Sequence, residues 1–134
     1  MKTAVIILAA GKGARLNSTL PKPLHQIGGR TMLAWSLDTA KAVSATRIIT
    51  VVPKDCDRVT AWLGEEESCV QDLPKGTGHA VLAAREKLAG FEGLVFIMFA
   101  DTPLIKVHSL TKLANAIKNG ADIAVLGFEA TNPE

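Results

Sequence analysis

The first apolar segment of the chain and the loop that follows it read Ala4-Val-Ile-Ile-Leu8-Ala-Ala-Gly11-Lys-Gly13-Ala-Arg-Leu16. Residues 4–8 have the composition of a buried strand, because apolar and β-branched residues follow one another without polar alternation. Gly11 and Gly13 then remove side chains where the backbone leaves the strand, so that successive N–H groups can converge on an anion. The segment therefore predicts a buried strand that opens into a phosphate-binding loop.

Similar apolar runs recur along the chain. They predict strands over Arg47–Val52, Leu94–Phe99 and Asp122–Phe128, and a weaker strand over Ser68–Gln71. Apolar stripes at helical spacing lie at residues 32–40, 59–63, 81–88 and 110–117, and three of these segments end at a glycine: Gly64, Gly90 and Gly120. This alternation predicts an α/β fold of three layers, a mostly parallel sheet with helices on both faces. Ligands of such sheets bind at the carboxyl ends of the strands.

Composition describes one ordinary globular domain. The chain has 134 residues, of which 48% are hydrophobic and 21% charged, and its net charge is +2. That balance argues against non-specific binding to nucleic acid or to anionic membranes, and no apolar run approaches the roughly 18 residues that suggest a membrane span. Cys56 and Cys69 have neither CxxC spacing nor an export signal, which favours reduced thiols and a cytoplasmic location.

The glycine loop carries cationic side chains but fits neither familiar phosphate motif. Lys12, Arg15 and Lys22 lie within one short stretch; Arg15 can bind phosphate oxygens in a bidentate way, whereas Lys22 is a point charge held between two prolines. A dinucleotide fingerprint would need a third glycine at Leu16, and the GxxxxGK[ST] pattern of a P-loop does not occur. Taken alone, the GxG could also be a plain turn with solvated lysines.

Three segments resemble known motifs. Residues 8–29 closely resemble LAAGxGxRxxxxxPKxLxxxxG, the signature of sugar-phosphate nucleotidyltransferases. Gln71 with Gly76-Thr-Gly-His-Ala80, and then Phe99-Ala-Asp-Thr-Pro-Leu-Ile105, resemble the QxxxxGTGHA and YGDxPLI segments of the uridylyltransferase (pyrophosphorylase) domain of bifunctional bacterial N-acetylglucosamine-1-phosphate uridylyltransferases. The resemblance covers essentially the whole chain and implies a Rossmann-like nucleotidyltransferase fold.

The resemblance implies nucleotidyl transfer in the supply of cell-wall precursors. A phosphate oxygen of a sugar-1-phosphate, expected to be N-acetylglucosamine-1-phosphate, attacks the α-phosphorus of a nucleoside triphosphate, expected to be UTP, and pyrophosphate leaves. Because the attacking phosphate is already anionic, no general base is required. The protein has to position two anions and neutralise their charge.

The resemblance also assigns roles to particular residues. Arg15 and Lys22 are the expected catalytic residues, facing the triphosphate, and Phe99 and Ala100 are expected on the acceptor side, where the family has Tyr and Gly. The expected nucleotide-binding residues are Leu8, Ala9, Ala10, Gly11, Gly13, Lys22, Gln71, Gly76 and Thr77.

Asp101 is the expected metal ligand. It follows a buried strand, and Mg²⁺ binds few carboxylates together with substrate phosphates. The structural alternatives are a turn-forming aspartate at Asp101 and an ordinary helix cap at Thr77. His79 is expected to pack or to form hydrogen bonds, since this chemistry needs no acid or base.

In the family, the nucleotidyltransferase domain continues beyond these motifs with an acceptor-binding part. An acetyltransferase half then follows it. The resemblance therefore implies that residues 1–134 are the nucleotide-binding portion of a longer protein. Two alternatives stay open: a related transferase that uses CTP, dTTP or GTP, and a nucleotide-binding module without catalysis. The sequence also leaves the oligomeric state open.

Overall fold

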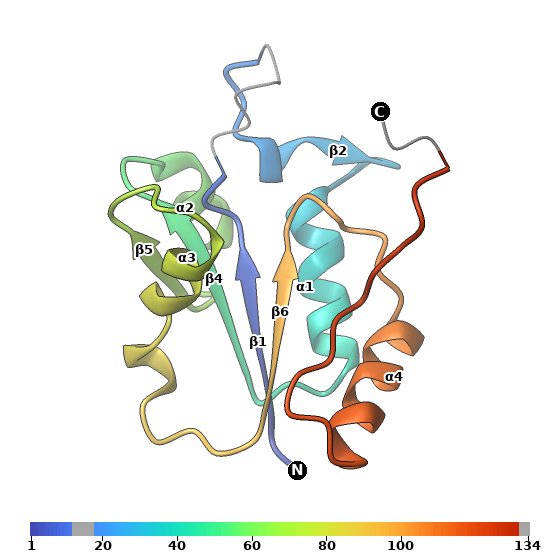
Figure 1. The fold of residues 1–134 in the computed structure, drawn as a ribbon. Coiled ribbons are helices and arrows are strands. Elements are labelled where there is room, and N and C mark those ends of the chain that lie inside the picture. Colours follow the sequence, from blue (N-terminus) through green and yellow to red (C-terminus); the bar gives the residue numbers. More distant parts are fainter. Residues whose placement is uncertain (12–17, 132–134) are drawn as a thin grey trace.

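A computed structural model describes residues 1–11 and 18–131 (Figure 1). The larger elements, in chain order, are β1 (Thr3–Leu8), α1 (Met32–Ala42), β4 (Arg47–Pro53), α2 (Asp57–Leu63), β5 (Ser68–Gln71), α3 (Thr77–Ala83), β6 (Leu94–Phe99) and α4 (Val107–Lys118). Two 3-10 turns, η1 (Lys22–Leu24) and η2 (Glu86–Leu88), and a small antiparallel hairpin, β2 (Gln26–Ile27) with β3 (Arg30–Thr31), complete them.

A parallel four-stranded sheet forms the centre of the molecule. Its strand order is β5-β4-β1-β6, and β1 pairs on one side with β4 and on the other with β6. The chain first builds outward from β1 to β4 and β5, and then crosses to the opposite side of β1 to form β6. Strand order therefore reverses at β1, which is where ligands of parallel sheets bind. The predicted strands over residues 4–8, 47–52, 68–71 and 94–99 are confirmed.

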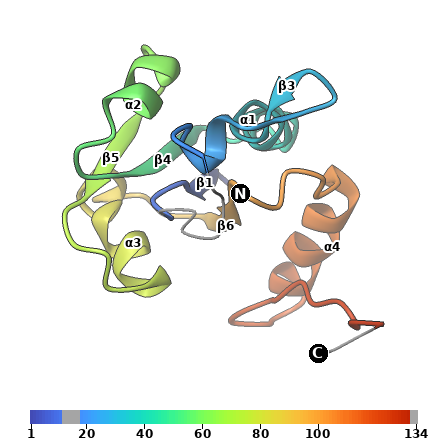
Figure 2. The same ribbon diagram turned by 90° about the horizontal axis from the view of Figure 1, so that it is seen from above.

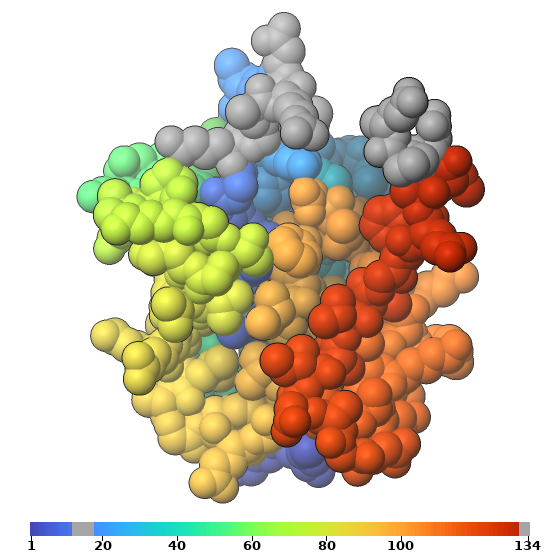
Figure 3. Space-filling model, viewed as in Figure 1, coloured from blue at the N-terminus to red at the C-terminus, as the bar shows by residue number. Residues whose placement is uncertain are grey.

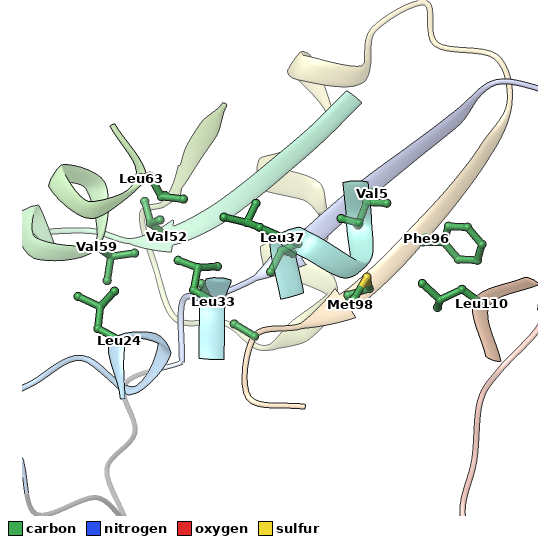
Figure 4. Close-up of a cluster of buried hydrophobic side chains, with 14 residues drawn as sticks. Val5, Leu24, Leu33, Leu37, Val52, Val59, Leu63, Phe96, Met98 and Leu110 are labelled. Carbon is green, nitrogen blue, oxygen red and sulfur yellow. The ribbon is translucent and has the colours of Figure 1, made fainter. Parts of the chain in front are cut away.

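Helices cover both faces of this sheet, which confirms the predicted three layers. On one face, Val5 of β1 packs with Leu33 and Leu37 of α1, Val59 of α2 and Leu110 of α4 (Figure 4). On the other face, Ile6 and Leu8 of β1 pack against Ala80 of α3 and Ala84, which follows it. Figure 2, viewed from above, shows α1 and α2 on one side of the strands and α3 on the other.

The helix ends follow local chemistry. The Thr31 hydroxyl accepts a hydrogen bond of 3.0 Å from the Ala34 N–H and so caps α1. Gly64 and Gly120 have φ angles of +59° and +100° directly after α2 and at the end of α4, where a left-handed residue stops a helix. The predicted helix around residues 81–88 is shorter than expected, because α3 ends at Ala83 and the 3-10 turn Glu86–Leu88 follows.

The predicted strand over Asp122–Phe128 is wrong. This segment is extended along the surface (red in Figure 3) but belongs to no sheet, and the side chains of Ile123, Val125 and Phe128 are 81%, 83% and 92% exposed. An extended backbone becomes a strand only when a neighbour satisfies its N–H and C=O groups. None of the described strands pairs with it, so its apolar composition alone does not make a strand.

One strand is also less buried than its composition predicts. Phe96 and Met98 of β6 are buried, whereas Val95, Ile97 and Phe99 on the opposite face are 39%, 49% and 44% exposed. The reason is that α3 packs against β1 and β4 and does not reach across to β6.

Two further expectations concern the whole chain. Cys56 and Cys69 are free thiols, as predicted. No helix in the described part of the chain is long and apolar enough to cross a membrane.

Candidate active site

A cleft of about 440 Å³ opens at the carboxyl ends of β1, β5 and β6. Every predicted site residue that the structure describes lines it; these are Leu8, Ala9, Ala10, Gly11, Lys22, Gln71, Gly76, Thr77, Phe99, Ala100 and Asp101. The predicted residues Gly13 and Arg15 lie outside the described residues. Motifs far apart in the sequence thus meet at one place.

Three residues that sequence reasoning did not assign to the site also line the cleft: Pro23, Pro74 and Ala80. Pro23 and Ala80 stand inside the motifs that carried the resemblance, so their position in those motifs was a usable signal. Pro74 lies in the loop between β5 and α3, and nothing in its residue type points to a ligand.

Sheet pairing fixes the backbone at the floor of the cleft. The Ala9 N–H donates to the carbonyl oxygen of Val51 at 2.8 Å, and the Ala100 N–H donates to that of Leu8 at 3.0 Å. The sheet pairing therefore continues past the ends of β1 and β6. Since the Ala9 N–H is used in this way, any contact that Ala9 makes with a nucleotide has to involve its carbonyl or its methyl group.

Gly11 is not required by the fold. Its φ lies outside the left-handed region, and a Cβ built on it would meet no atom of the described residues within 4 Å. An alanine would therefore fit the backbone and the surrounding described residues. Because Gly11 lines the cleft, the effect of its missing side chain is to leave room there.

The two charged residues among the described lining residues are paired with each other. Lys22 Nζ donates to Asp101 Oδ2 at 2.8 Å, and the two side chains are 35% and 43% exposed. They come from η1 and from the turn after β6, so the ion pair spans the cleft between two motifs. Half-exposed pairs of this kind add little to stability, about 0–1 kcal/mol.

Local hydrogen bonds position both partners of this pair. On the lysine side, the Leu24 and His25 N–H groups donate to the carbonyls of Pro21 and Lys22, which closes the 3-10 turn. On the aspartate side, the N–H and the hydroxyl of Thr102 both donate to the Phe99 carbonyl at 3.2 Å. Asp101 therefore does form part of a turn, and that turn directs it to the cleft.

Gln71 ends β5 with a buried side chain that is held in place. Its Nε2 donates to the carbonyl oxygen of Gly76 at 3.2 Å and lies 3.1 Å from Nδ1 of His79. The expectation that His79 forms hydrogen bonds is thereby confirmed. Gly76 occupies the N-cap position of α3, and no side chain forms a capping hydrogen bond there. Thr77 is therefore not the helix cap that was its structural alternative.

The chemistry available in the cleft is that of charge neutralisation. Its described lining offers one cation, one carboxylate, a buried amide, the hydroxyl of Thr77 and apolar residues, but no serine, cysteine or histidine. Among the described residues there is no group of three or more His, Cys, Asp or Glu that could hold a metal ion. Asp101 is the single carboxylate of the described lining. One carboxylate suits a metal that completes its coordination with phosphate oxygens and water, as Mg²⁺ does.

A family model described as the MobA-like NTP transferase domain matches residues 5–134. The chain belongs to this family. Membership agrees with the resemblance to nucleotidyltransferases that the motifs predicted, and the matched region includes every residue that lines the cleft.

One curated protein is similar to this chain in sequence, and solved structures are similar to it in fold. The bifunctional protein GlmU of Hyphomonas neptunium is 44% identical over 97% of this chain, and the match covers 29% of GlmU. A nucleotidyl transferase from Methanothermobacter has a TM-score of 0.69 at 16% identity, covering 85% of this chain and 57% of that one.

A third comparison adds a protein that was solved with a metal. Rv0371c of Mycobacterium tuberculosis, in complex with manganese, has a TM-score of 0.65 at 19% identity, covering 89% of this chain and 61% of that one. The two solved structures show that this chain shares their Rossmann-like fold. The chain thus spans 29% of the length of the Hyphomonas neptunium GlmU that it resembles.

Proposed function

We propose that residues 1–134 form the nucleotide-binding portion of a nucleotidyltransferase that transfers a uridylyl group from UTP to N-acetylglucosamine-1-phosphate and releases pyrophosphate. The observation that carries this proposal is the meeting of separate motifs in one cleft at the carboxyl ends of parallel strands. The 44% identity to GlmU supports UTP and this acceptor, and with them a role in cell-wall precursor synthesis. The free thiols support a cytoplasmic location.

Charge neutralisation by the loops is the proposed catalytic contribution of the chain. Lys22 already lies in the cleft, and Arg15 is proposed beside it on the strength of the signature. Both would hold the triphosphate while the acceptor phosphate attacks in line. Because that phosphate is anionic at neutral pH, the lack of a histidine among the described lining residues fits the reaction.

The base of the nucleotide is proposed to lie against Gln71, Gly76 and Thr77. Since the Gln71 amide nitrogen is engaged by Gly76 and His79, its amide oxygen is left to accept a hydrogen bond from an N–H group of the base. Leu8, Ala9, Ala10 and Gly11 would then support the nucleoside from below. A buried amide of fixed orientation is a suitable device for distinguishing one base from another.

The acceptor side is assigned to Phe99 and Ala100, and the metal to Asp101. Asp101 would hold a divalent cation, proposed to be Mg²⁺, which would supply charge stabilisation at the phosphates when bound. The manganese complex of Rv0371c supports a divalent ion in a protein of this fold.

Two measurements test the proposal. Isothermal titration with UTP, CTP, dTTP and GTP in the presence of Mg²⁺ should give the strongest binding with UTP. Release of pyrophosphate from UTP should require both N-acetylglucosamine-1-phosphate and Mg²⁺. Preference for another triphosphate would redirect the proposal to a related transferase, and binding of UTP without pyrophosphate release would reduce it to a nucleotide-binding module.

A further inference from the structure

The ion pair between Lys22 and Asp101 joins two groups that the proposed function needs for different ligands. Lys22 is assigned to the triphosphate and Asp101 to the metal, yet their charged atoms are 2.8 Å apart. The described lining of the cleft contains no other charged side chain. A triphosphate that binds Lys22 therefore has to displace Asp101, and a metal that binds Asp101 has to displace Lys22.

A metal ion alone meets an unfavourable site at Asp101. It finds one carboxylate, already neutralised by a cation, and the described lining of the cleft offers no further carboxylate, histidine or cysteine. The positive charge of Lys22 would also repel the metal at this distance. A triphosphate alone meets the converse difficulty, since Lys22 is engaged and the carboxylate of Asp101 repels phosphate oxygens.

The two ligands together remove both difficulties. Phosphate oxygens offer Lys22 a new partner and supply the metal with the ligands that the protein lacks. Asp101 is then released to the metal.

We propose that the Lys22–Asp101 ion pair couples the two binding events, so that metal and triphosphate each bind more tightly when the other has broken the pair. This inference rests on the proposed function and adds to it a regulation of binding. Thermodynamic linkage requires the coupling to act equally in both directions.

Binding of UTP in the presence of EDTA is the decisive measurement. Replacing Asp101 by Asn frees Lys22 and removes the repulsive carboxylate, so Asp101→Asn should raise the affinity for metal-free UTP by about fivefold or more, the range usual for coupled sites. The same variant should lose most of the additional affinity that Mg²⁺ gives to the wild type. An ordinary metal ligand would show only the second effect.

The reciprocal measurement uses Mn²⁺ without nucleotide, followed by electron paramagnetic resonance. Lys22→Met removes the competing cation and keeps an unbranched side chain of nearly the same length, so Mn²⁺ affinity should rise by about fivefold. The gain should vanish in the double variant Lys22→Met/Asp101→Asn. Both sites are half exposed, so the variants are expected to fold, and circular dichroism checks this.

A second surface ion pair provides a matched control. Lys41 Nζ and Glu66 Oε1 are 2.6 Å apart, with side chains 54% and 38% exposed, and neither residue lines the cleft. Lys41→Met and Glu66→Gln make the same changes of net charge, and neither should alter UTP or Mn²⁺ affinity. Equal effects at the two pairs would show that net charge alone is responsible and would overturn the proposal.

The outcomes separate this inference from the proposed function. If wild-type protein binds UTP with Mg²⁺ but Asp101→Asn leaves or lowers metal-free UTP affinity, the coupling is wrong and the proposed function stands. If no nucleoside triphosphate binds to the wild type with Mg²⁺, the proposed function itself is wrong.

Discussion

The N–H of Ala100 donates to the carbonyl oxygen of Leu8 at 3.0 Å, one residue beyond the last pair of the β1–β6 ladder. This hydrogen bond ties the strand end that carries the glycine loop to the turn that carries Asp101. Backbone pairing therefore links the proposed nucleotide side of the cleft directly to the proposed acceptor side. Substrate positioning, which this chemistry depends on, is thereby built into the backbone.

Removing either proposed catalytic cation should affect turnover far more than stability. Lys22→Ala and Arg15→Ala should each reduce pyrophosphate release by about 100-fold, the usual effect of deleting one transition-state charge partner. Because the Lys22 side chain is half exposed, the free energy of unfolding of Lys22→Ala, measured in urea, should change by less than about 1 kcal/mol. The control is Lys41→Ala, at a surface ion pair away from the cleft, which should retain full activity. Full activity of Lys22→Ala would contradict the assignment of Lys22 to the triphosphate.

Gly11→Ala should separate folding from binding. The backbone tolerates alanine there and no described atom would contact the new methyl group, so the free energy of unfolding should stay constant or rise by up to about 1 kcal/mol. UTP affinity should fall about tenfold, since an extra methyl in a filled site costs typically 1–3 kcal/mol.

Gly127→Ala is the control for that experiment. Gly127 has the same freedom from contacts but lies outside the cleft. Its alanine variant should bind UTP like the wild type. If Gly11→Ala and Gly127→Ala behave alike towards UTP, Gly11 is not part of the nucleotide site.

Cys69 should react slowly with alkylating reagents at neutral pH. Burial raises the pKa of its thiol, with Glu67 raising the pKa further and Lys87 opposing the rise. The thiolate is the reactive form, so a raised pKa means less thiolate in the folded protein than in the unfolded chain at the same pH. Raising the pH through the thiol range should reduce this difference.

The measurement uses Cys56→Ser protein, in which Cys69 is the remaining cysteine. Iodoacetamide alkylation of the folded protein is compared with that of the same protein in urea at several pH values. The ratio of folded to unfolded rate should increase with pH. A ratio that does not depend on pH would mean that access to Cys69, and not its pKa, controls the reaction.

Sequence was sufficient to predict the four strands of the main sheet and to bring the described residues named from the motifs to one cleft. The apolar runs that begin at Ala4 and at Leu94 predicted strands from their composition. The prediction is confirmed because these two strands pair with each other in the sheet. Asp122–Phe128 is also largely apolar but lacks a described partner strand, and pairing is a property of the fold that a single segment does not encode. The exposed face of β6 has a similar origin, since it depends on how far α3 reaches.

The site residues were predicted by type and motif, but their relationships were not. Nothing in the sequence indicates that Lys22 and Asp101 form an ion pair, because 79 residues separate them and only the strand order brings them together. The engagement of the Ala9 N–H by Val51 likewise depends on strand register, and that of the Gln71 amide by His79 depends on how α3 follows β5. Motifs thus located the cleft, whereas the structure shows which donors and charges are already in use.

Mapping UTP binding by NMR tests the central claim most directly. On ¹⁵N-labelled protein with Mg²⁺, titration with UTP should shift the amide signals of Gly11, Gln71, Thr77 and Asp101, which come from the three motif segments around the cleft. Signals at the opposite end of the sheet, such as that of Ser44, should not move. Shifts that are absent, or that cluster away from the carboxyl ends of β1, β5 and β6, would contradict the account.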